Sequence, residues 1–188
     1  MILAKSTNLP LIKRLPSVRG RLHAAEPLGR LTWFKVGGAA DVFYSPDDAE
    51  DLTGFLAECS ADIPVIVMGN ASNMLVRDGG VRGVVIRLGE KFKYVKIDGC
   101  FIHAGGGASD ITIARVARDA SLKGLEFLTG IPGTIGGSVA MNAGAYGREI
   151  KNVLVSCTVV DRKGLLREIP ASAMSFGYRK TSLTSGEI

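Results

Sequence analysis

The chain has 188 residues, of which 46% are hydrophobic and 22% charged, and its formal net charge is +5. This composition is ordinary for a globular protein, and the longest apolar runs have the length of strands, which excludes a membrane-spanning helix. Aromatic residues make up only 6% of the chain and no basic helix is predicted, so nucleic-acid binding is disfavoured.

Residues 1–30 are predicted to be a poorly structured N-terminal extension. The strands and the helix that follow predict a βαβ unit with parallel strands, the second of them buried, within a first lobe at 31–89. Ser45 is the expected N-cap of the helix, with proline next to it and acids in the first turn, and the helix is expected to end near Cys59. The strands are expected at residues 41–44, 64–67 and 83–87.

Residues 90–188 predict a second lobe with antiparallel strand pairs, one of them joined by an Asp-Gly turn. A helix is predicted to begin at Ser109 or Asp110, with Gly124 just past its end. The segment 170–181 is expected to be short and irregular, with at most one helical turn. The paired strands are expected at residues 93–98 with 101–104, and at 153–160 with 165–169. The two lobes together predict an α+β fold.

The cysteines and histidines predict no metal chemistry. Cys59, Cys100 and Cys157 lie far apart and form no CxxC motif, which argues against a disulfide framework and a zinc site, so each is expected to be a small buried apolar residue. There are only two histidines, and His103 is predicted to point outward from a strand. Residues 1–20 hold no signal-like apolar run, which predicts a cytoplasmic protein.

The most informative stretch is Gly130-Ile-Pro-Gly-Thr-Ile-Gly-Gly-Ser-Val-Ala-Met-Asn-Ala-Gly-Ala-Tyr-Gly147, which holds six glycines. Because glycine has the largest backbone entropy cost, this stretch is expected to form neither helix nor strand. Its use would be to bring bare backbone N–H groups close to an anion such as a pyrophosphate. A flexible linker is the alternative, but linkers lack apolar residues, and four are interleaved here and are expected to be buried: Ile131, Ile135, Val139 and Met141.

A second loop, residues 67–75, follows the strand at 64–67 and contains small residues together with Ser72 and Asn73, which can donate hydrogen bonds. Two such loops from two lobes would grip one extended anionic ligand, and a dinucleotide has that shape. The chain has no GxxxxGK(S/T) motif, and Gly105-Gly-Gly107 does not open a GxGxxG fingerprint, so a P-loop and a Rossmann fold are disfavoured.

Five motifs in a fixed order then carry a resemblance to a known family. They are Thr32-Trp-Phe-Lys-Val-Gly-Gly38, Gly69-Asn-Ala-Ser-Asn73, Gly130-Ile-Pro-Gly-Thr-Ile-Gly-Gly137, Met141-Asn-Ala-Gly-Ala-Tyr-Gly147 and Phe176-Gly-Tyr-Arg179. Over about residues 30–182 the chain resembles the UDP-N-acetylenolpyruvoylglucosamine reductases, the MurB family.

The resemblance implies an FAD-binding domain of the vanillyl-alcohol-oxidase (PCMH) type, with subdomains at residues 31–89 and 90–188. It implies FAD as the cofactor, NADPH as its reductant and a UDP-sugar as the substrate, whose enolpyruvyl ether is reduced to a lactyl ether in cytoplasmic peptidoglycan precursor synthesis. It assigns no protein partner, no nucleic acid and no metal.

The same resemblance assigns roles to individual residues. Arg179 would be the catalytic residue, because its planar guanidinium can bind a substrate carboxylate on which negative charge builds during reduction. Tyr178 would contact the substrate or pack beside it. The residues assigned to the FAD pyrophosphate and its surroundings are Gly69, Asn70, Ala71, Ser72, Asn73, Gly130, Pro132, Gly133, Gly136, Gly137, Ser138, Asn142 and Gly144.

Two features depart from the family pattern. Ala71 stands where the family usually has glycine; a positive φ there would cost on the order of 1 kcal/mol, and the methyl group would crowd the cofactor. The chain also ends at Ile188, before the substrate-binding domain that supplies a serine proton donor and a glutamate in the family. We therefore expect an N-terminal portion without turnover of its own, with an open sheet edge where the next strand is missing. The alternatives are a non-catalytic FAD- or nucleotide-binding module and another oxidoreductase of the same flavin fold.

Overall fold

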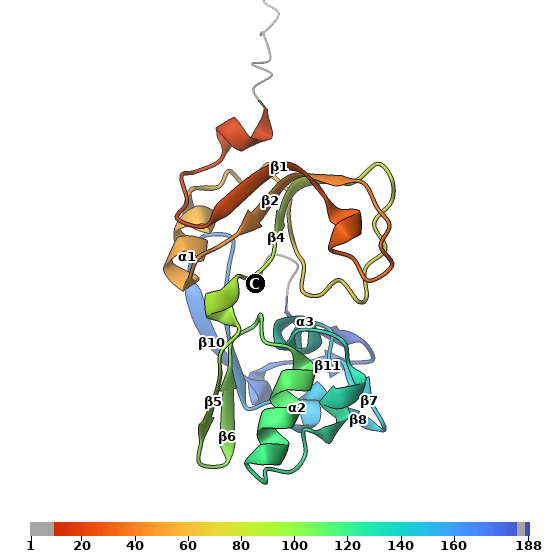
Figure 1. The fold of residues 1–188 in the computed structure, drawn as a ribbon. Coiled ribbons are helices and arrows are strands. Elements are labelled where there is room, and N and C mark those ends of the chain that lie inside the picture. Colours follow the sequence, from red (N-terminus) through yellow and green to blue (C-terminus); the bar gives the residue numbers. More distant parts are fainter. Residues whose placement is uncertain (1–9, 184–186) are drawn as a thin grey trace, which may run out of the picture.

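The structure, a computed structural model, describes residues 10–183 and 187–188, and these form two lobes of mixed helix and strand (Figure 1). The first lobe contains the helix α1 (Ala49–Glu58), the strands β1 (Arg21–Pro27), β2 (Ala39–Ser45), β3 (Val65–Val67) and β4 (Val81–Ile86), and the 3-10 helices η1 (Leu11–Arg14), η2 (Leu28–Arg30) and η3 (Glu90–Phe92). The predicted α+β class is confirmed.

The second lobe is built from two helices and a set of two-stranded sheets. It contains the helices α2 (Asp110–Asp119) and α3 (Ile135–Ala140), the strands β5 (Val95–Asp98), β6 (Phe101–Ala104), β7 (Gly144–Ala145), β8 (Arg148–Glu149), β9 (Ser156–Val160), β10 (Leu166–Pro170), β11 (Phe176–Gly177) and β12 (Lys180–Thr181), and the 3-10 helices η4 (Glu126–Gly130), η5 (Ile150–Asn152) and η6 (Ala171–Ala173).

The sheet of the first lobe has the strand order β1-β2-β4-β3. β2 and β3 both pair with β4 in parallel, which confirms the predicted βαβ unit, with β4 inserted between its two strands. The prediction that residues 64–67 are buried is wrong, because β3 is the edge strand and Ile66 and Val67 are each 39% exposed.

The prediction that residues 1–30 are poorly structured is wrong for the residues that the structure describes. Residues 1–9 lie outside the described part. β1 pairs antiparallel with β2 and so belongs to the sheet. The Asp51 carboxylate fixes the entry to β1, since it accepts hydrogen bonds from the backbone N–H groups of Arg19 at 2.7 Å and Gly20 at 2.9 Å. Burial raises the pKa of Asp51, but hydrogen bonds from the backbone N–H groups of Asp47, at 2.9 Å, and then of Arg19 and Gly20 outweigh it, so the pKa lies below its ordinary value.

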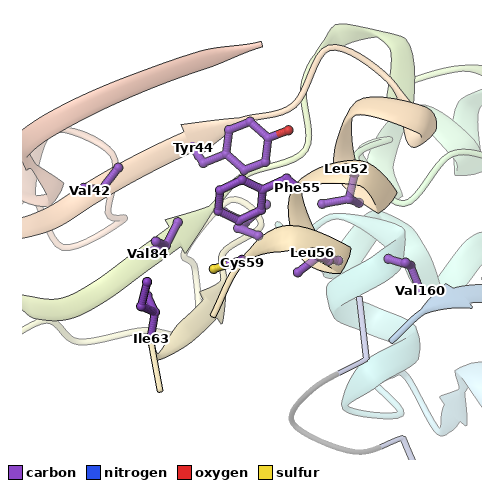
Figure 2. Packing of buried hydrophobic residues seen from close by; sticks show 10 residues of the cluster. Val42, Tyr44, Leu52, Phe55, Leu56, Cys59, Ile63, Val84 and Val160 are labelled. Carbon is purple, nitrogen blue, oxygen red and sulfur yellow. The ribbon is translucent and has the colours of Figure 1, made fainter. Parts of the chain in front are cut away.

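Helix α1 covers one face of this sheet, and its cap differs from the prediction. The N-cap is Asp48, whose side chain accepts a hydrogen bond from the backbone N–H of Asp51 at 3.0 Å, and Ser45 is still the last residue of β2. The helix ends at Glu58 with Cys59 as its C-cap, as predicted. Figure 2 shows Phe55 of α1 against Tyr44 of β2, with ring centroids 4.4 Å apart, in the core between helix and sheet.

The glycine-rich segment contains the helix α3, although its composition predicts no regular structure. Hydrogen bonds to the preceding segment override the poor helix propensity of glycine: the N–H of Ile135 donates to Ala108 O at 2.9 Å, and that of Gly136 donates to Gly106 O at 3.0 Å. Of its apolar residues, Val139 is buried and the other three are half-buried. The linker alternative is therefore wrong.

The remaining elements of the second lobe follow the prediction closely. β5 with β6 and β9 with β10 form the two expected antiparallel hairpins. α2 begins at Asp110, but it ends at Asp119, and Ser121 with φ 58°, rather than Gly124, takes the left-handed position after it. The segment 170–181, expected to be short and irregular with at most one helical turn, has that turn in η6 and also forms the small β11–β12 hairpin.

The β9–β10 hairpin joins the two lobes. Figure 1 shows it rising beside α1, and Val160 at the end of β9 is part of the core of the first lobe. The Arg162 guanidinium donates to the carbonyl oxygens of Ser60 at 3.3 Å and Ile63 at 3.1 Å, just beyond the end of α1. Val160 and Ile188 exchange two backbone hydrogen bonds of 2.9 Å. At this residue, the edge of β9 that does not face β10 is therefore paired with Ile188. The division of the chain at residues 89/90 stays a prediction.

All three cysteines are free, and the prediction that each is buried holds for Cys59. Cys157 is half-buried, and Cys100 is exposed in the turn between β5 and β6. His103 is exposed on β6 as predicted. Within the described residues, no three His, Cys, Asp or Glu side chains are grouped so that they could hold a metal ion. No helix in that part of the chain is long and apolar enough to cross a bilayer.

Candidate functional site

The two glycine-containing loops, one from each lobe, meet as predicted. The Asn70 side chain donates a hydrogen bond from Nδ2 to the carbonyl oxygen of Gly133 at 3.0 Å. A side chain at Gly69 would overlap the hydroxyl of Thr134, so the backbone of the first loop lies directly against the second. Asn73 contacts the same segment further on, with Nδ2 3.8 Å from the sulfur of Met141. Residues far apart in sequence thus form one surface.

The loop at residues 69–73 leaves its backbone donors available. Within residues 10–183 and 187–188, none of the five N–H groups of this loop donates a hydrogen bond to another protein group. Gly133 and Thr134 in the facing loop likewise donate none from their N–H groups to the described residues. A cluster of free backbone N–H groups from two sides is suited to an anion, since each donor otherwise lacks a partner.

Ala71 adopts a positive φ of 51°. In this left-handed conformation alanine is less favourable than the glycine that the family usually has here. The expected crowding of a cofactor by its methyl group is not supported, however. Ala71 is only 4% exposed and packs in an apolar cluster with Leu28, Met68 and Val76. The methyl group therefore stabilises the first lobe from inside, and this opposes the strain in its backbone.

This balance predicts a small effect for Ala71→Gly. Relief of the left-handed strain is worth about 1–2 kcal/mol, but the substitution also loses a buried methyl worth about 0.8 kcal/mol and adds glycine entropy of about 0.5–1 kcal/mol. The matched control is Ala25→Gly, because Ala25 has φ 52° and is exposed. In chemical denaturation Ala25→Gly should be the more stable variant by about 1 kcal/mol, the value of the buried methyl. Equal stabilities would show that the Ala71 methyl contributes nothing.

The glycines of the second loop differ in what surrounds them. A Cβ at Gly136 would lie 2.8 Å from Gly106 O, and one at Gly133 would lie 2.8 Å from Oδ2 of Asp110, so both glycines are required by contacts inside the protein. At Gly130 the Tyr146 ring occupies the space. Gly137 is different: it is exposed, and the nearest atom to its Cβ would be Thr134 Oγ1 at 3.5 Å. Pro132 in the same loop is also exposed.

Two residues assigned to the cofactor by resemblance have side chains that point into the protein. Ser138 is 2% exposed, and its hydroxyl donates to the carboxylate of Asp110 at 2.8 Å. Asn142 is 1% exposed, and its Nδ2 donates to Glu149 Oε2 at 3.0 Å and to Gly177 O at 3.1 Å. Their side chains support the loop and do not face its surface.

Asp110 is the residue that sequence reasoning missed. It reads as an acidic residue in the first turn of α2, which is a common stabilising position. The structure instead shows a side chain with no exposed surface, whose Oδ1 has no hydrogen-bond partner among the described residues. The apolar residues that surround it in sequence were the available signal, but they do not reveal which loop covers it.

Tyr178 and Arg179 form the tip of the β11–β12 hairpin. Arg179 has φ 55°, and its guanidinium donates to Gly144 O at 3.3 Å and lies 5.7 Å from the centroid of the Tyr178 ring. Tyr178 is 86% exposed, which leaves the upper part of the hairpin accessible. Asn142 braces the base of this hairpin through Gly177.

An open pocket of about 480 Å³ lies at this hairpin tip. Three basic side chains, Arg148, Lys151 and Arg179, line it together with one acid, Glu149. Lys151 pairs with Glu149 at 2.8 Å, and this contact, followed by the Asn142 hydrogen bond, lowers the pKa of Glu149. The excess of positive charge suits an anionic ligand. The remaining lining residues are Gly144, Ala145, Gly147, Asn152 and Tyr178.

Known proteins match the chain over most of its length. The UDP-N-acetylenolpyruvoylglucosamine reductase of Parvibaculum lavamentivorans is 50% identical over 178 residues, which are 95% of this chain and 57% of that protein. The reductase of the same name from Rhodospirillum rubrum is 52% identical over 174 residues, 93% of this chain and 54% of that protein. The chain therefore spans a little over half the length of these relatives.

Solved structures agree with these relatives. UDP-N-acetylenolpyruvylglucosamine reductase (MurB) from Thermus caldophilus superposes with a TM-score of 0.76 at 33% identity, over 92% of this chain and 60% of that one. Cholesterol oxidase from Brevibacterium sterolicum has a TM-score of 0.60 at 19% identity, over 83% of this chain and 35% of that one, which shows a shared fold alone. The predicted resemblance and the predicted FAD-binding fold are confirmed. Residues 40–169 match the FAD binding domain model, and the chain belongs to the FAD-binding domain family.

Proposed function

We propose that the chain is the FAD-binding part of an NADPH-dependent reductase that converts UDP-N-acetylenolpyruvoylglucosamine to UDP-N-acetylmuramate in cytoplasmic peptidoglycan precursor synthesis. The observation that carries this proposal is the contact between the two loops, which brings free backbone N–H groups from both lobes to one surface. The identity of 50–52% to named reductases over 93–95% of the chain supports the choice of reaction.

The residues present fit an FAD diphosphate. The N–H groups at residues 69–73 and those of Gly133 and Thr134 have no protein acceptor in the described part of the chain, and they would donate to the phosphate oxygens. Gly137 is exposed and would allow the ligand to approach the backbone closely. FAD, when bound, would supply the hydride carrier between NADPH and the substrate.

Arg179 would act on the substrate and not on the cofactor loops. Its guanidinium presents a planar set of donors at the rim of a basic pocket, and a carboxylate matches that geometry in two parallel hydrogen bonds. As the enolpyruvyl double bond is reduced, negative charge builds toward the substrate carboxylate, and the guanidinium stabilises it. The Tyr178 ring beside Arg179 would restrict the guanidinium to this place.

The test uses the purified 188-residue chain and its visible absorption spectrum. After addition of FAD and gel filtration, we expect a retained flavin band that NADPH bleaches, and a spectral change on addition of the UDP-sugar. Arg179→Ala should keep the flavin band and weaken the UDP-sugar response at least about tenfold, since hydrogen bonds to charged groups contribute about 1.5–3 kcal/mol. Arg82→Ala, at an 87% exposed surface position, is the matched control.

Two results would contradict the proposal. A folded chain that retains no flavin would show that these loops do not form the cofactor site. A flavin band that neither NADPH nor the UDP-sugar affects would favour a non-catalytic FAD-binding module over the reductase.

A further inference from the structure

Asp110 lies directly beneath the place where the two loops meet. Its side chain has no exposed surface, and its Oδ2 receives the Ser138 hydroxyl at 2.8 Å. The Cα of Gly133 packs on the same oxygen, so closely that a Cβ there would lie 2.8 Å from it. The carbonyl of Gly133 accepts hydrogen bonds from both lobes, from the backbone N–H of Asp110 at 3.4 Å and from Asn70 at 3.0 Å.

The environment of this carboxyl group favours its neutral form. Burial raises the pKa of Asp110 to about 6, and the Ser138 hydrogen bond opposes this rise. The loop before α3 and α3 itself face it with Gly133 and Ser138, neither of which carries a charge. No charged side chain of the described residues contributes to this pKa. The second oxygen, Oδ1, has no partner in that part of the chain and is the natural place for a proton.

We propose that Asp110 is a positioning residue of the cofactor loop, and that the chain binds FAD with Asp110 protonated, so that binding takes up one proton from solvent. The inference depends on the proposed function, in which the loops at 69–73 and 130–138 hold the FAD diphosphate. A diphosphate is an anion, and an ionised carboxylate directly behind the same backbone would repel it through a medium of low dielectric. Protonation of Oδ1 removes that repulsion and leaves the Ser138 hydrogen bond to Oδ2 in place.

The proposal predicts how FAD affinity depends on pH. FAD has no group that titrates in the neutral range, so a dependence there reports on the protein. Above the pKa of Asp110 the dissociation constant should rise by up to about tenfold per pH unit. Asp110→Asn should bind FAD with the affinity that the unchanged chain shows at low pH, and without this slope.

A second variant should shift the pH dependence of FAD affinity in a direction that a purely structural role of Asp110 would not produce. Ser138→Ala removes the hydrogen bond that stabilises the ionised carboxylate, so the pH at which affinity begins to fall should move upward. Asp98→Asn, at an exposed carboxylate at the end of β5, is the matched control and should leave the slope unchanged.

The experiment is a titration of FAD into the 188-residue chain, followed by flavin fluorescence between about pH 5.5 and 8.5, with calorimetry in two buffers of different ionisation enthalpy to count protons. Uptake of close to one proton, absent in Asp110→Asn, would support the proposal. FAD affinity that is independent of pH, or a slope that survives in Asp110→Asn, would overturn it. Absence of FAD binding by every variant at every pH would instead overturn the proposed function, and this inference with it.

Discussion

Replacing Asn142 with alanine is expected to lower the free energy of unfolding by about 3–5 kcal/mol and to loosen the hairpin that carries Arg179. Asn142 is 1% exposed and connects three segments, through Glu149 Oε2, Gly177 O and the backbone N–H of Lys151, which donates to its Oδ1 at 3.0 Å. Each buried group left without a partner costs about 1–3 kcal/mol. The φ of 44° at this residue adds about 1–2 kcal/mol when alanine replaces asparagine.

Asn142→Gly separates these contributions, because glycine accepts a positive φ without a Cβ clash. We expect it to be less destabilised than Asn142→Ala but still well below the unchanged chain. Chemical denaturation measures the stability, and the rate of tryptic cleavage after Arg179 and Lys180 measures the freedom of the hairpin. A loss of less than about 1 kcal/mol for Asn142→Ala, with unchanged cleavage, would mean that Asn142 does not hold the hairpin.

Gly136→Ala should destabilise the second lobe by about 1–3 kcal/mol, the range for an added methylene in a packed interior. The new Cβ would lie 2.8 Å from Gly106 O and 3.2 Å from Gly106 Cα, both backbone atoms that cannot rotate away. The hydrogen bond from Gly136 N to Gly106 O would lengthen as the two segments separate. FAD affinity should fall with it, because this contact fixes the start of α3 behind the cofactor loop.

The neighbouring Gly137→Ala is the matched control for this result. Its Cβ would meet no atom nearer than 3.5 Å, and alanine is favoured over glycine in a helix by up to about 1 kcal/mol. This variant should therefore be as stable as the unchanged chain or slightly more stable. If the cofactor lies over Gly137, as proposed, it should still bind FAD more weakly. Equal stability of Gly136→Ala and Gly137→Ala in denaturation would contradict the packing derived from the structure.

The elements that the sequence predicts well are those whose signals are local. The hairpin of β5 and β6 follows from alternation around an Asp-Gly turn, and α1 follows from the apolar spacing of Leu52, Phe55 and Leu56. β1 was missed because its strand character depends on long-range pairing with β2 and on the Asp51 carboxylate, neither of which is visible in a window of a few residues.

The candidate site was predictable in its location but not in its details. The motifs predict the two loops that meet at Asn70 and Gly133, because glycine-rich segments commonly bring backbone N–H groups close to a ligand. They could not separate a glycine needed for internal packing, such as Gly136, from an exposed one, such as Gly137. Nor could they show that the Ser138 hydroxyl faces Asp110, a contact that only the tertiary structure reveals.

The β9–β10 hairpin has a consequence for how the chain can be divided. Val160 fills part of the core beneath α1, and Arg162 binds carbonyl groups just past the end of that helix. Residues 31–89 excised as an autonomous module would therefore expose a hole in their core and leave those carbonyls without their donor. The two lobes are interdigitated and should melt together in one cooperative transition, so shuffling them between homologues requires a junction that moves this hairpin with the first lobe.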